Sequence, residues 1–517
     1  MKNHMDGWFY TPAQIKRYLS TRITSLKPPR SRLIAKFGCL PHLQTKIDNP
    51  VRVLREVNRH QWLMFTLGFL SWVWDAVDLL CLTEIAEEFG VDNAAVSWSK
   101  GITVTLMLRS VGALVFGACS DRYGCKWPMM VCLSLFVVLE LASGFCQTLS
   151  QFLAVRSLYG IAMGGMFGPA ASTALSDLPY DARGVLSGLF QNGYSTGYLL
   201  ACIFYRALVP TTSYGWRSLF WFAAVPPVLI MVFRWYMPET DHFQAIKAER
   251  EMNVLAEQQP NGEPGSTWRG RFRKFAAFAR ESGKEVKKNW VLLVFMVVIM
   301  TAFNSCSHGS QDFFPTFLKS QAGFNSSQVV IISVVGQLGS ITGGTTLGYI
   351  SSFSGRRLIM LIACIFGAAL VPAYMLPRSM VLVASAFFEQ AFVGGVWGPV
   401  PVYLMELAPA TLRTTVMGLT YQLGNLASSG SATIQAIIGE RYKLSLGPQG
   451  QQRFDYGRVI AIFIGSVWGV LFLLLLLGPE MTESERQEEA ENVRNRADDR
   501  VEETIKINAQ HVEKAMA

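Results

Sequence analysis

The chain has 517 residues, of which 50% are hydrophobic and only 16% are charged, with a formal net charge of +9. An ordinary soluble protein carries about 25% charged residues, and here the deficit is concentrated in long apolar blocks of about 20 residues, the length that spans a bilayer. The composition therefore excludes an ordinary soluble protein and predicts an all-α membrane protein that crosses the bilayer several times.

The N-terminal tail, residues 1–60, is basic, with twelve Lys and Arg against three acidic residues. Basic residues beside a first span stay in the cytoplasm, so we expect a cytoplasmic tail. Nucleic-acid binding is the other reading of a basic tail, but nothing else in the chain supports it, and we expect no nucleic-acid partner. We recognise no signal peptide before the first span and expect the tail to be retained.

Twelve candidate spanning helices follow, six in an N-terminal half at residues 61–237 and six in a C-terminal half at residues 290–478. An even number of spans puts both termini on one side of the membrane. The predicted spans lie near 61–83, 95–118, 127–146, 150–172, 184–208, 216–237, 290–314, 327–350, 357–376, 379–404, 412–438 and 457–478.

Two further segments complete the predicted organisation. Residues 238–289 form a central loop, in which QQPNGEPGST is typical of a flexible linker and the flanks are basic and helical in pattern. Residues 479–517 form a charged tail, amphipathic or disordered in composition. Lys506 and Lys514 in this tail make trafficking or ubiquitylation machinery an expected partner.

The charges of the short connections favour one orientation. Arg183, Arg356 and Arg413 all fall on the side of the N-terminal tail. The positive-inside rule therefore places both tails and the central loop in the cytoplasm. The glycosylation sequon that begins at Asn325 falls on the outer side, where such sites occur.

An internal repeat relates the two halves. GGMFGP at 164–169 recurs as GGVWGP at 394–399, and at the same offset Arg183 is matched by Arg413. Each copy falls in the fourth-to-fifth span of its half, so the halves repeat in parallel orientation. Such paired halves place a substrate site between them near the midplane of the membrane.

The loop between the second and third spans, GACSDRYGCK at 117–126, resembles the signature loop of the major facilitator superfamily. The matching residues are Gly117, Asp121, Arg122, Gly124 and Lys126. The second half keeps a divergent copy, GYISSFSGRR at 348–357, in which Ser352 replaces the acid. We interpret these residues as gating and helix-packing elements rather than as contacts to the cargo.

The seventh span contains a polar stripe, NSCSHGSQDFFPT at 304–316. On a helical wheel five of its polar side chains share an arc of about 140° and rise about 12 Å along the axis. Hydrogen bonding between helices needs only one or two polar groups, so an acid, an imidazole and two amides together favour a functional site. Pro315 frees a carbonyl and predicts a kink.

The same stretch indicates no metal centre. His308 is the only histidine in a span, no second His or Cys stands one helical turn away, and Asp312 alone cannot complete a coordination shell. The nine cysteines are scattered and indicate neither a disulfide framework nor a metal site. We also find no nucleophile with its base, so we expect neither an enzyme nor a bound cofactor.

The stripe resembles the seventh-helix signature of Jen-type fungal carboxylate permeases, which are proton symporters of the sialate:proton symporter family within the major facilitator superfamily. WVWDAVD at 72–78 and YQLGN at 421–425 extend the resemblance. It implies a major facilitator fold of twelve helices in the plasma membrane. It also implies secondary active import of a monocarboxylate with protons, lactate and pyruvate first, with acetate and propionate as further candidates.

The resemblance also implies roles for single residues. His308 and Asp312, one helical turn apart, would form a coupled proton site in which the proton belongs to the pair. The expected substrate-binding residues are Asn304, Ser307, His308, Ser310, Gln311 and Thr316 of the stripe, Gln422 and Asn425 of the eleventh span, and Arg109 of the second.

The buried charges of the first half admit two readings each. Arg109 offers a planar fork to a carboxylate substrate, or it is neutralised by Asp75 or Asp78 of the first span. Arg156 begins a stretch similar to the superfamily's fourth-helix motif, and it either assists proton transfer or packs. Asp75 and Asp78 are interpreted as structural or gating residues.

Three other functions remain as alternatives. A dicarboxylate carrier, for succinate or malate, would need a second cation near the site, and the seventh span offers only Lys319 at its outer end. A sialate carrier belongs to the same family. A non-transporting nutrient receptor would keep the fold but would gain little from a proton-coupling pair.

Overall fold

The computed structural model describes residues 50–81, 94–248, 268–377, 379–444 and 453–480, with residues 16, 18–20, 22 and 26 near the N-terminus. The predicted C-terminal tail with Lys506 and Lys514 lies outside the described residues, as does most of the N-terminal tail. A short helix, α3 (Pro50–Glu56), precedes the first span.

Each of the twelve predicted spans coincides with one helix or with a pair of helices that a short break separates. The unbroken ones are α4 (Arg59–Cys81), α5 (Ala94–Tyr123), α6 (Lys126–Phe145), α15 (Trp290–Gln311), α17 (Ser326–Ser354), α18 (Arg356–Met375) and α23 (Tyr456–Leu477). The broken ones are α7 (Leu149–Gly164) with α8 (Phe167–Leu175), α9 (Tyr180–Gln191) with α10 (Gly193–Leu208), α11 (Arg217–Ala223) with α12 (Val225–Tyr236), α19 (Leu382–Trp397) with α20 (Val400–Leu407), and α21 (Arg413–Ser428) with α22 (Ser431–Gly439).

The remaining elements are short or lie outside the spans. Helix α16 (Phe314–Ser320) continues α15 after the break that Pro315 predicts, and α14 (Trp268–Lys288) precedes α15 in the central connection. A 3-10 turn, η1 (Ala410–Leu412), precedes α21. The strands β1 (Lys443–Leu444) and β2 (Arg453–Phe454) pair antiparallel between α22 and α23.

Six helical segments of the described chain are long and apolar enough to cross a membrane on their own, and one bent pair raises the number to seven. Helices α4 and α5 are not among the six. They carry Asp75 and Arg109, which lower the mean hydropathy, yet both charges are buried inside the protein. The count of twelve crossings therefore stays a prediction, which the helix arrangement fits.

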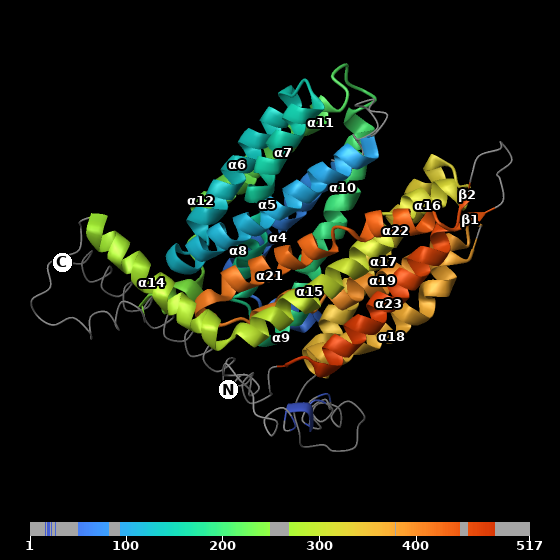
Figure 1. The fold of residues 1–517 in the computed structure, drawn as a ribbon. Helices are drawn as coiled ribbons and strands as arrows, with labels where there is room; N and C mark the ends of the chain where they lie inside the picture. Colours follow the sequence, from blue (N-terminus) through green and yellow to red (C-terminus); the bar gives the residue numbers. More distant parts are fainter. Residues whose placement is uncertain are drawn as a thin grey trace, which may run out of the picture.

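The halves form two adjacent bundles, with α4–α12 in blue to green and α15–α23 in yellow to red (Figure 1). The repeated GG motif allows two helices to pack closely in each half. A Cβ on Gly164 of α7 would overlap the carbonyl oxygen of Arg109 on α5, and a Cβ on Gly394 of α19 would overlap that of Ser340 on α17. The glycines therefore allow the fourth span of each half to touch the second.

The two halves are fastened together at one end, which we call the basic end because Arg183, Arg356 and Arg413 lie there. Asp121, in the last turn of α5, accepts hydrogen bonds from the backbone N–H groups of Thr414 and Thr415, at 2.9 and 2.8 Å, and from the Thr415 hydroxyl at 2.6 Å. A carboxylate from one half thus caps the positive N-terminal end of α21 in the other, an arrangement we call the latch.

The rest of the signature loop shapes the same end. Gly124 has a φ of 95°, which a side chain would disfavour, and it turns the chain from α5 into α6. Lys126 donates from Nζ to the carbonyls of Trp235 and Met237 at the end of α12, both at 2.8 Å. The guanidinium of Arg122 lies 5.8 Å from the ring of Phe278 on α14. The loop therefore ties α5, α6, α12 and α14 together.

Asp121→Asn should weaken the latch, because the amide loses the charge that the N-terminus of α21 stabilises. Hydrogen bonds to charged groups contribute about 1.5–3 kcal/mol each, so we expect a shift of about tenfold towards conformations open at the basic end. Distances between one spin label on each half at this end should lengthen. Asp241→Asn is the control, because this acid lies at the same end in the central loop and its backbone N–H donates to Asp177 of the N-terminal half. An unchanged distance distribution for Asp121→Asn would remove the latch from the gating scheme.

Candidate functional site

A polar cavity of about 50 Å³ lies between the halves and is partly open to solvent. Six of the nine predicted substrate-binding residues line it: Arg109, Asn304, Ser307, His308, Gln311 and Asn425. Asp75 and Asp312 line it as well. Helices α4 and α5 of the first half and α15 and α21 of the second therefore contribute the charged groups and several amides of the cavity wall, and Gln191 and Asn192, at the end of α9, add two more amides.

His308 holds a central position, because each of its ring nitrogens faces an oxygen. Nδ1 lies 2.7 Å from the carboxylate of Asp312, and Nε2 lies 2.8 Å from the side-chain oxygen of Asn425. A doubly protonated imidazole donates both hydrogen bonds. In a neutral ring that keeps its proton on Nδ1, Nε2 is an acceptor. Asn425 would then have to turn its amide group so that its NH₂ group, rather than its oxygen, faces Nε2. The site therefore accommodates either protonation state.

The stripe runs from the interior towards solvent. Asn304 is 3% exposed and donates to the carbonyl of Met300, whereas the side chain of His308 is 18% exposed and that of Asp312 is 42% exposed. Asp312 lies at the end of α15 away from the basic end. Solvent therefore reaches the His308–Asp312 pair from the end that the latch leaves open.

The guanidinium of Arg109 forms an ion pair with Asp75, but this pair does not use all of its hydrogen-bond donors. Its Nη2 lies 3.0 Å from Oδ2 of Asp75, and both side chains are 2% exposed. Nε and Nη1 of Arg109 are buried and have no hydrogen-bond partner among the described residues, and Oδ1 of Asp75 has none there either. A buried N–H without an acceptor costs about 1–3 kcal/mol, so this guanidinium is arranged to receive a further acceptor.

Trp72, Trp397 and Tyr421 form much of the apolar part of the cavity wall, with Phe167 packed behind Tyr421, and none of these rings was predicted to belong to the site. Tyr421 stacks on Phe167 at 4.1 Å between ring centroids and lies 5.6 Å from Trp72 and 5.9 Å from Trp397. Phe167 and Trp397 occupy equivalent places in the two copies of the repeated motif. The repeat was therefore the signal that could have found them.

Three predicted residues do not line the cavity. Ser310 is buried and donates to the carbonyl of Ser307, and Thr316 is exposed on α16, beyond the end of α15. Gln422 is fully buried, and within the described ranges neither of its side-chain polar atoms has a hydrogen-bond partner. Ser307 and Gln311, which do line the cavity, also bond across helices, to Trp397 at 2.6 Å and Gln390 at 2.8 Å.

The other buried charges of the first half lie apart from the cavity wall. Arg156 pairs with Glu140 at 2.8 Å, and its guanidinium lies 4.2 Å from the ring of Tyr159. This geometry favours the packing interpretation of Arg156. Asp78 belongs to α4, but its side chain lies outside the described residues.

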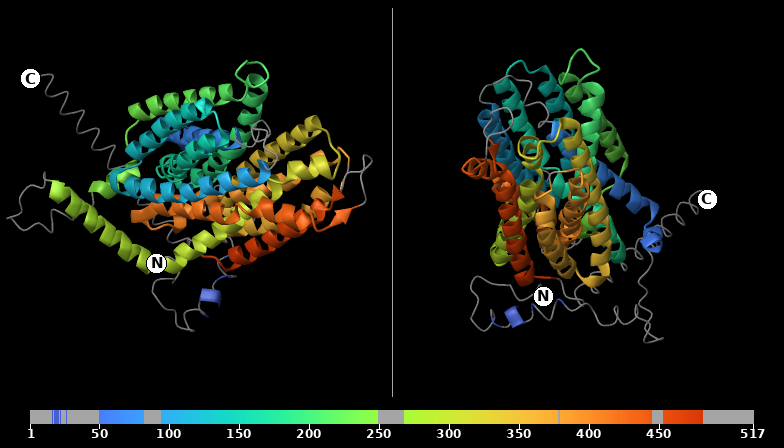
Figure 2. Two further views of the ribbon diagram at one scale, coloured as in Figure 1. Left: turned by 45° about the horizontal axis from the view of Figure 1, so that its top comes forward. Right: turned by 90° about the vertical axis from the view of Figure 1, so that its right-hand side faces the viewer.

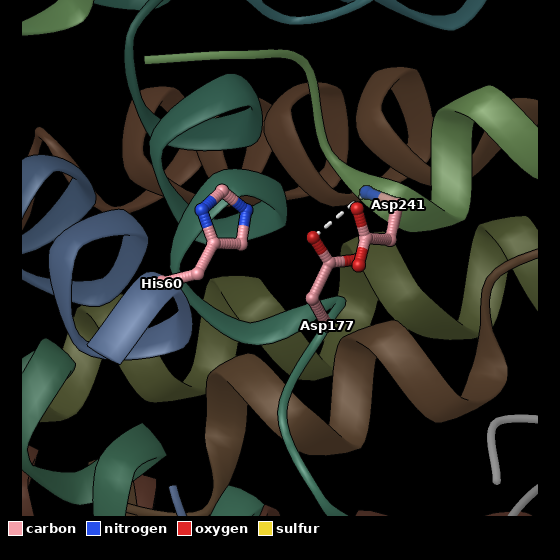
Figure 3. Close-up of side chains that lie close together, drawn as sticks. All are labelled: His60, Asp177 and Asp241. Atoms are coloured by element: carbon pink, nitrogen blue, oxygen red, sulfur yellow. Dashed lines mark hydrogen bonds between the residues drawn. The ribbon is translucent and has the colours of Figure 1, made fainter. Parts of the chain in front are cut away.

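Among the described residues, one group of side chains that could ligate a metal lies at the basic end. The ligand atoms of His60, Asp177 and Asp241 are within 4.8 Å of one another (Figure 3). The carboxylate of Asp177 accepts hydrogen bonds from the backbone N–H groups of Asp241 at 2.8 Å and His242 at 2.9 Å, where a helix over 241–248 begins. This capping explains why the aspartates are close, so we assign the cluster a structural role.

Glu140→Gln should destabilise the fold while leaving the cavity residues in place. Removing one partner of a buried ion pair costs about 3–5 kcal/mol, because the other charge stays buried and unpaired. We expect a clear fall in the apparent Tm of the purified protein, whereas Glu56→Gln on the exposed face of α3 should leave the Tm unchanged. A Glu140→Gln protein of unchanged Tm whose substrate-driven proton uptake is lost would instead support a proton-transfer role for the pair.

Comparison with known proteins gives one family. The profile of the sugar (and other) transporter family matches residues 62–477. A carboxylic acid transporter protein homolog of Saccharomyces cerevisiae is 36% identical over 474 residues, which cover 90% of this chain and 74% of the yeast protein. The sialic acid transporter NanX of Escherichia coli is 23% identical over 434 residues, 82% of this chain and 95% of NanX.

A solved structure shares the fold. The proton:xylose symporter XylE superposes with a TM-score of 0.63 at 16% identity, covering 83% of this chain and 98% of XylE. The predicted major facilitator fold is therefore confirmed, and with it a protein that crosses the membrane several times.

Proposed function

We propose that this chain, which belongs to the sugar (and other) transporter family of the major facilitator superfamily, imports a monocarboxylate together with protons across the plasma membrane. The names of several relatives describe transport of carboxylates, since they include transporters of carboxylic acids, cis,cis-muconate and sialic acid. Carboxylate transport is thus the coarse function that the relatives support, and the finer assignment rests on the cavity.

The observation that carries the assignment is the unsaturated guanidinium of Arg109. Asp75 occupies one nitrogen, and Nε and Nη1 remain without acceptors in a cavity that small anions can occupy. A carboxylate is the acceptor that matches a guanidinium edge in charge and planar geometry. The substrate carboxylate would therefore bind beside Asp75 on the same guanidinium.

The remaining lining favours a short monocarboxylate. Among the lining residues the second cationic group is His308, and Asp312 already faces it. Lys319 lies elsewhere, in a groove between α10 and α16–α17. A dicarboxylate would thus lack a second free cation, whereas Trp72, Trp397 and Tyr421 offer apolar contact to a short carbon chain such as that of lactate or pyruvate.

His308 and Asp312 would bind the coupling proton as a pair. One proton carried with each monoanion makes transport electroneutral, so the membrane potential contributes little free energy to it. The free energy available from the proton gradient is then about 1.4 kcal/mol for each unit of pH difference across the membrane. No bound cofactor is needed, and the protein acts as a transporter rather than as an enzyme.

The conformation fits one step of alternating access. The latch holds the basic end closed, and solvent reaches Asp312 from the other end. If the basic end faces the cytoplasm, with both tails, this is a state ready to take up substrate from outside. Rocking of the two halves would then release the latch and open the cavity to the cytoplasm.

Uptake of labelled lactate by transport-deficient cells tests the proposal. Wild-type uptake should rise several-fold between an external pH of about 7 and about 5 and should be accompanied by proton entry, because the pair must be loaded from the outer side. His308→Ala and Asp312→Asn should lose proton-coupled uptake at normal surface expression, whereas Ser320→Ala on the exposed face of α16 should retain it.

Two outcomes would change the assignment. Uptake of succinate or sialate without lactate would keep the transporter and replace its substrate. Persistent uptake in both pair variants would make the stripe a structural feature, and binding without any uptake would favour a nutrient receptor.

Arg109→Lys tests the carboxylate contact directly. Lysine keeps the charge for Asp75 but loses the planar fork, so the affinity for lactate should fall by about tenfold to a hundredfold, as expected for one lost charge-assisted hydrogen bond. Binding of labelled lactate to the purified protein is the measurement. Arg217→Lys, which changes an arginine of the same half outside the cavity, is the control, and equal affinities in the two variants would remove Arg109 from the substrate site.

A further inference from the structure

Helix α14 (Trp268–Lys288) has no role in the transport scheme, yet its position is unusual. It lies in the central connection and is separated by Asn289 alone from α15, a membrane-crossing segment. Figure 1 and the left view of Figure 2 both show α14 projecting beyond the bundle on its way to α15. Its C-terminal end therefore lies at the boundary between the membrane and the aqueous phase at the basic end.

One face of α14 is fixed to the bundle. Phe278 is partly buried, packs on the core, and lies 5.8 Å from the guanidinium of Arg122 at the end of α5. Ser282 and Glu285, which follow Phe278 at helical spacing, are also partly covered. This contact sets the rotation of the helix, so the directions of its other faces are determined.

The next face is apolar and exposed. Ala279, Gly283 and Val286 recur at the spacing of four and three that aligns residues along one side of a helix, and Val286 is 44% exposed. Trp290, at the first position of α15, is exposed as well. An exposed apolar row that ends in a tryptophan at the start of a span is typical of a helix edge at a membrane interface.

A basic row lies directly beside the apolar one. Arg280, Lys284 and Lys288 follow at intervals of four residues, and all three are exposed. Over its full length α14 carries eight Lys and Arg against two Glu. A row of cations along an apolar edge matches a surface that offers phosphate charges above hydrocarbon, which is the surface of an anionic lipid leaflet.

We propose that α14 is a docking surface for anionic phospholipids of the leaflet at the basic end. Ala279, Gly283 and Val286 would lie against the acyl boundary, and Arg280, Lys284 and Lys288 would bind headgroup phosphates and carboxylates. A nucleic acid would also attract the cations, but it would leave the apolar row in water. The junction with α15 holds this face within reach of the headgroups, which favours the membrane as the partner.

Hydrogen–deuterium exchange of the full-length protein in nanodiscs tests the docking. We compare phosphatidylcholine discs with discs that also contain phosphatidylserine. Amides of residues 279–288 should exchange more slowly in the anionic discs, by about fivefold for each cation that reaches the headgroups, and high salt should remove the difference. Amides of α23, inside the bundle, should be the same in both discs.

Two charge variants make the test specific. The triple variant R280Q/K284Q/K288Q should exchange in the anionic discs at the rate seen in phosphatidylcholine. R52Q/R55Q/R59Q removes three cations at the same end from α3 and the start of α4, and it should retain the slow exchange of α14. Equal exchange in the two lipids, or equal loss in both variants, would overturn the proposal. Protection of residues 279–288 by added RNA, but not by anionic lipid, would assign the helix to a nucleic-acid partner instead.

Discussion

The fold of the first half depends on placing a guanidinium inside a membrane protein without leaving it uncompensated. Arg109 is buried between α4 and α5, and Asp75 neutralises it through one nitrogen. Gly164 lets α7 touch the backbone of α5 at Arg109, so the helix that carries the charge is held from two sides. The pairing is incomplete, since two nitrogens of the guanidinium have no acceptor in the part of the chain that the structure describes. The same constraint that orders these helices therefore leaves the guanidinium able to accept a further anionic partner, and the proposed function assigns that place to the substrate carboxylate.

The sequence repeat produces similar halves with different tasks. Phe167 and Trp397 occupy equivalent positions and both contact Tyr421, so the aromatic wall is shared. The two halves do not contribute the same charged groups to the cavity. The first half supplies Arg109, and the second supplies the polar stripe. The loops differ for the same reason. Asp121 reaches across to the other half, whereas Arg356 of the second loop pairs with Glu406 of its own half at 3.3 Å. With Ser352 in place of an acid, the second loop has no carboxylate at the position that Asp121 occupies in the first, and the part of the chain that the structure describes contains one such latch.

The sequence predicted features that depend on neighbours along the chain. Apolar blocks placed the twelve helices within a few residues, and a spacing of four placed His308 beside Asp312. It could not choose between Asp75 and Asp78 as partner of Arg109, because both stand on nearly one face of the same helix and only tertiary packing distinguishes them. Thr316 was assigned to the site by the family resemblance, and it lies on α16, beyond the break that follows α15. Gln422 was carried over from a family resemblance, and packing buries it away from the cavity wall.

Helix α21 joins the two ends of the proposed mechanism. Its N-terminal turn is held by Asp121 of the other half, and Asn425, about 16 Å further along the helix axis, faces Nε2 of His308. The orientation of the Asn425 amide follows from the proton on His308, so the protonation state of the pair changes how α15 is bonded to α21. A helix is stiff over this length, and a change in how one end is held alters the strain at the other. In the proposed mechanism the latch and the His308–Asp312 pair would therefore act on one rigid element, which is the physical requirement for coupling a proton to the opening of the basic end.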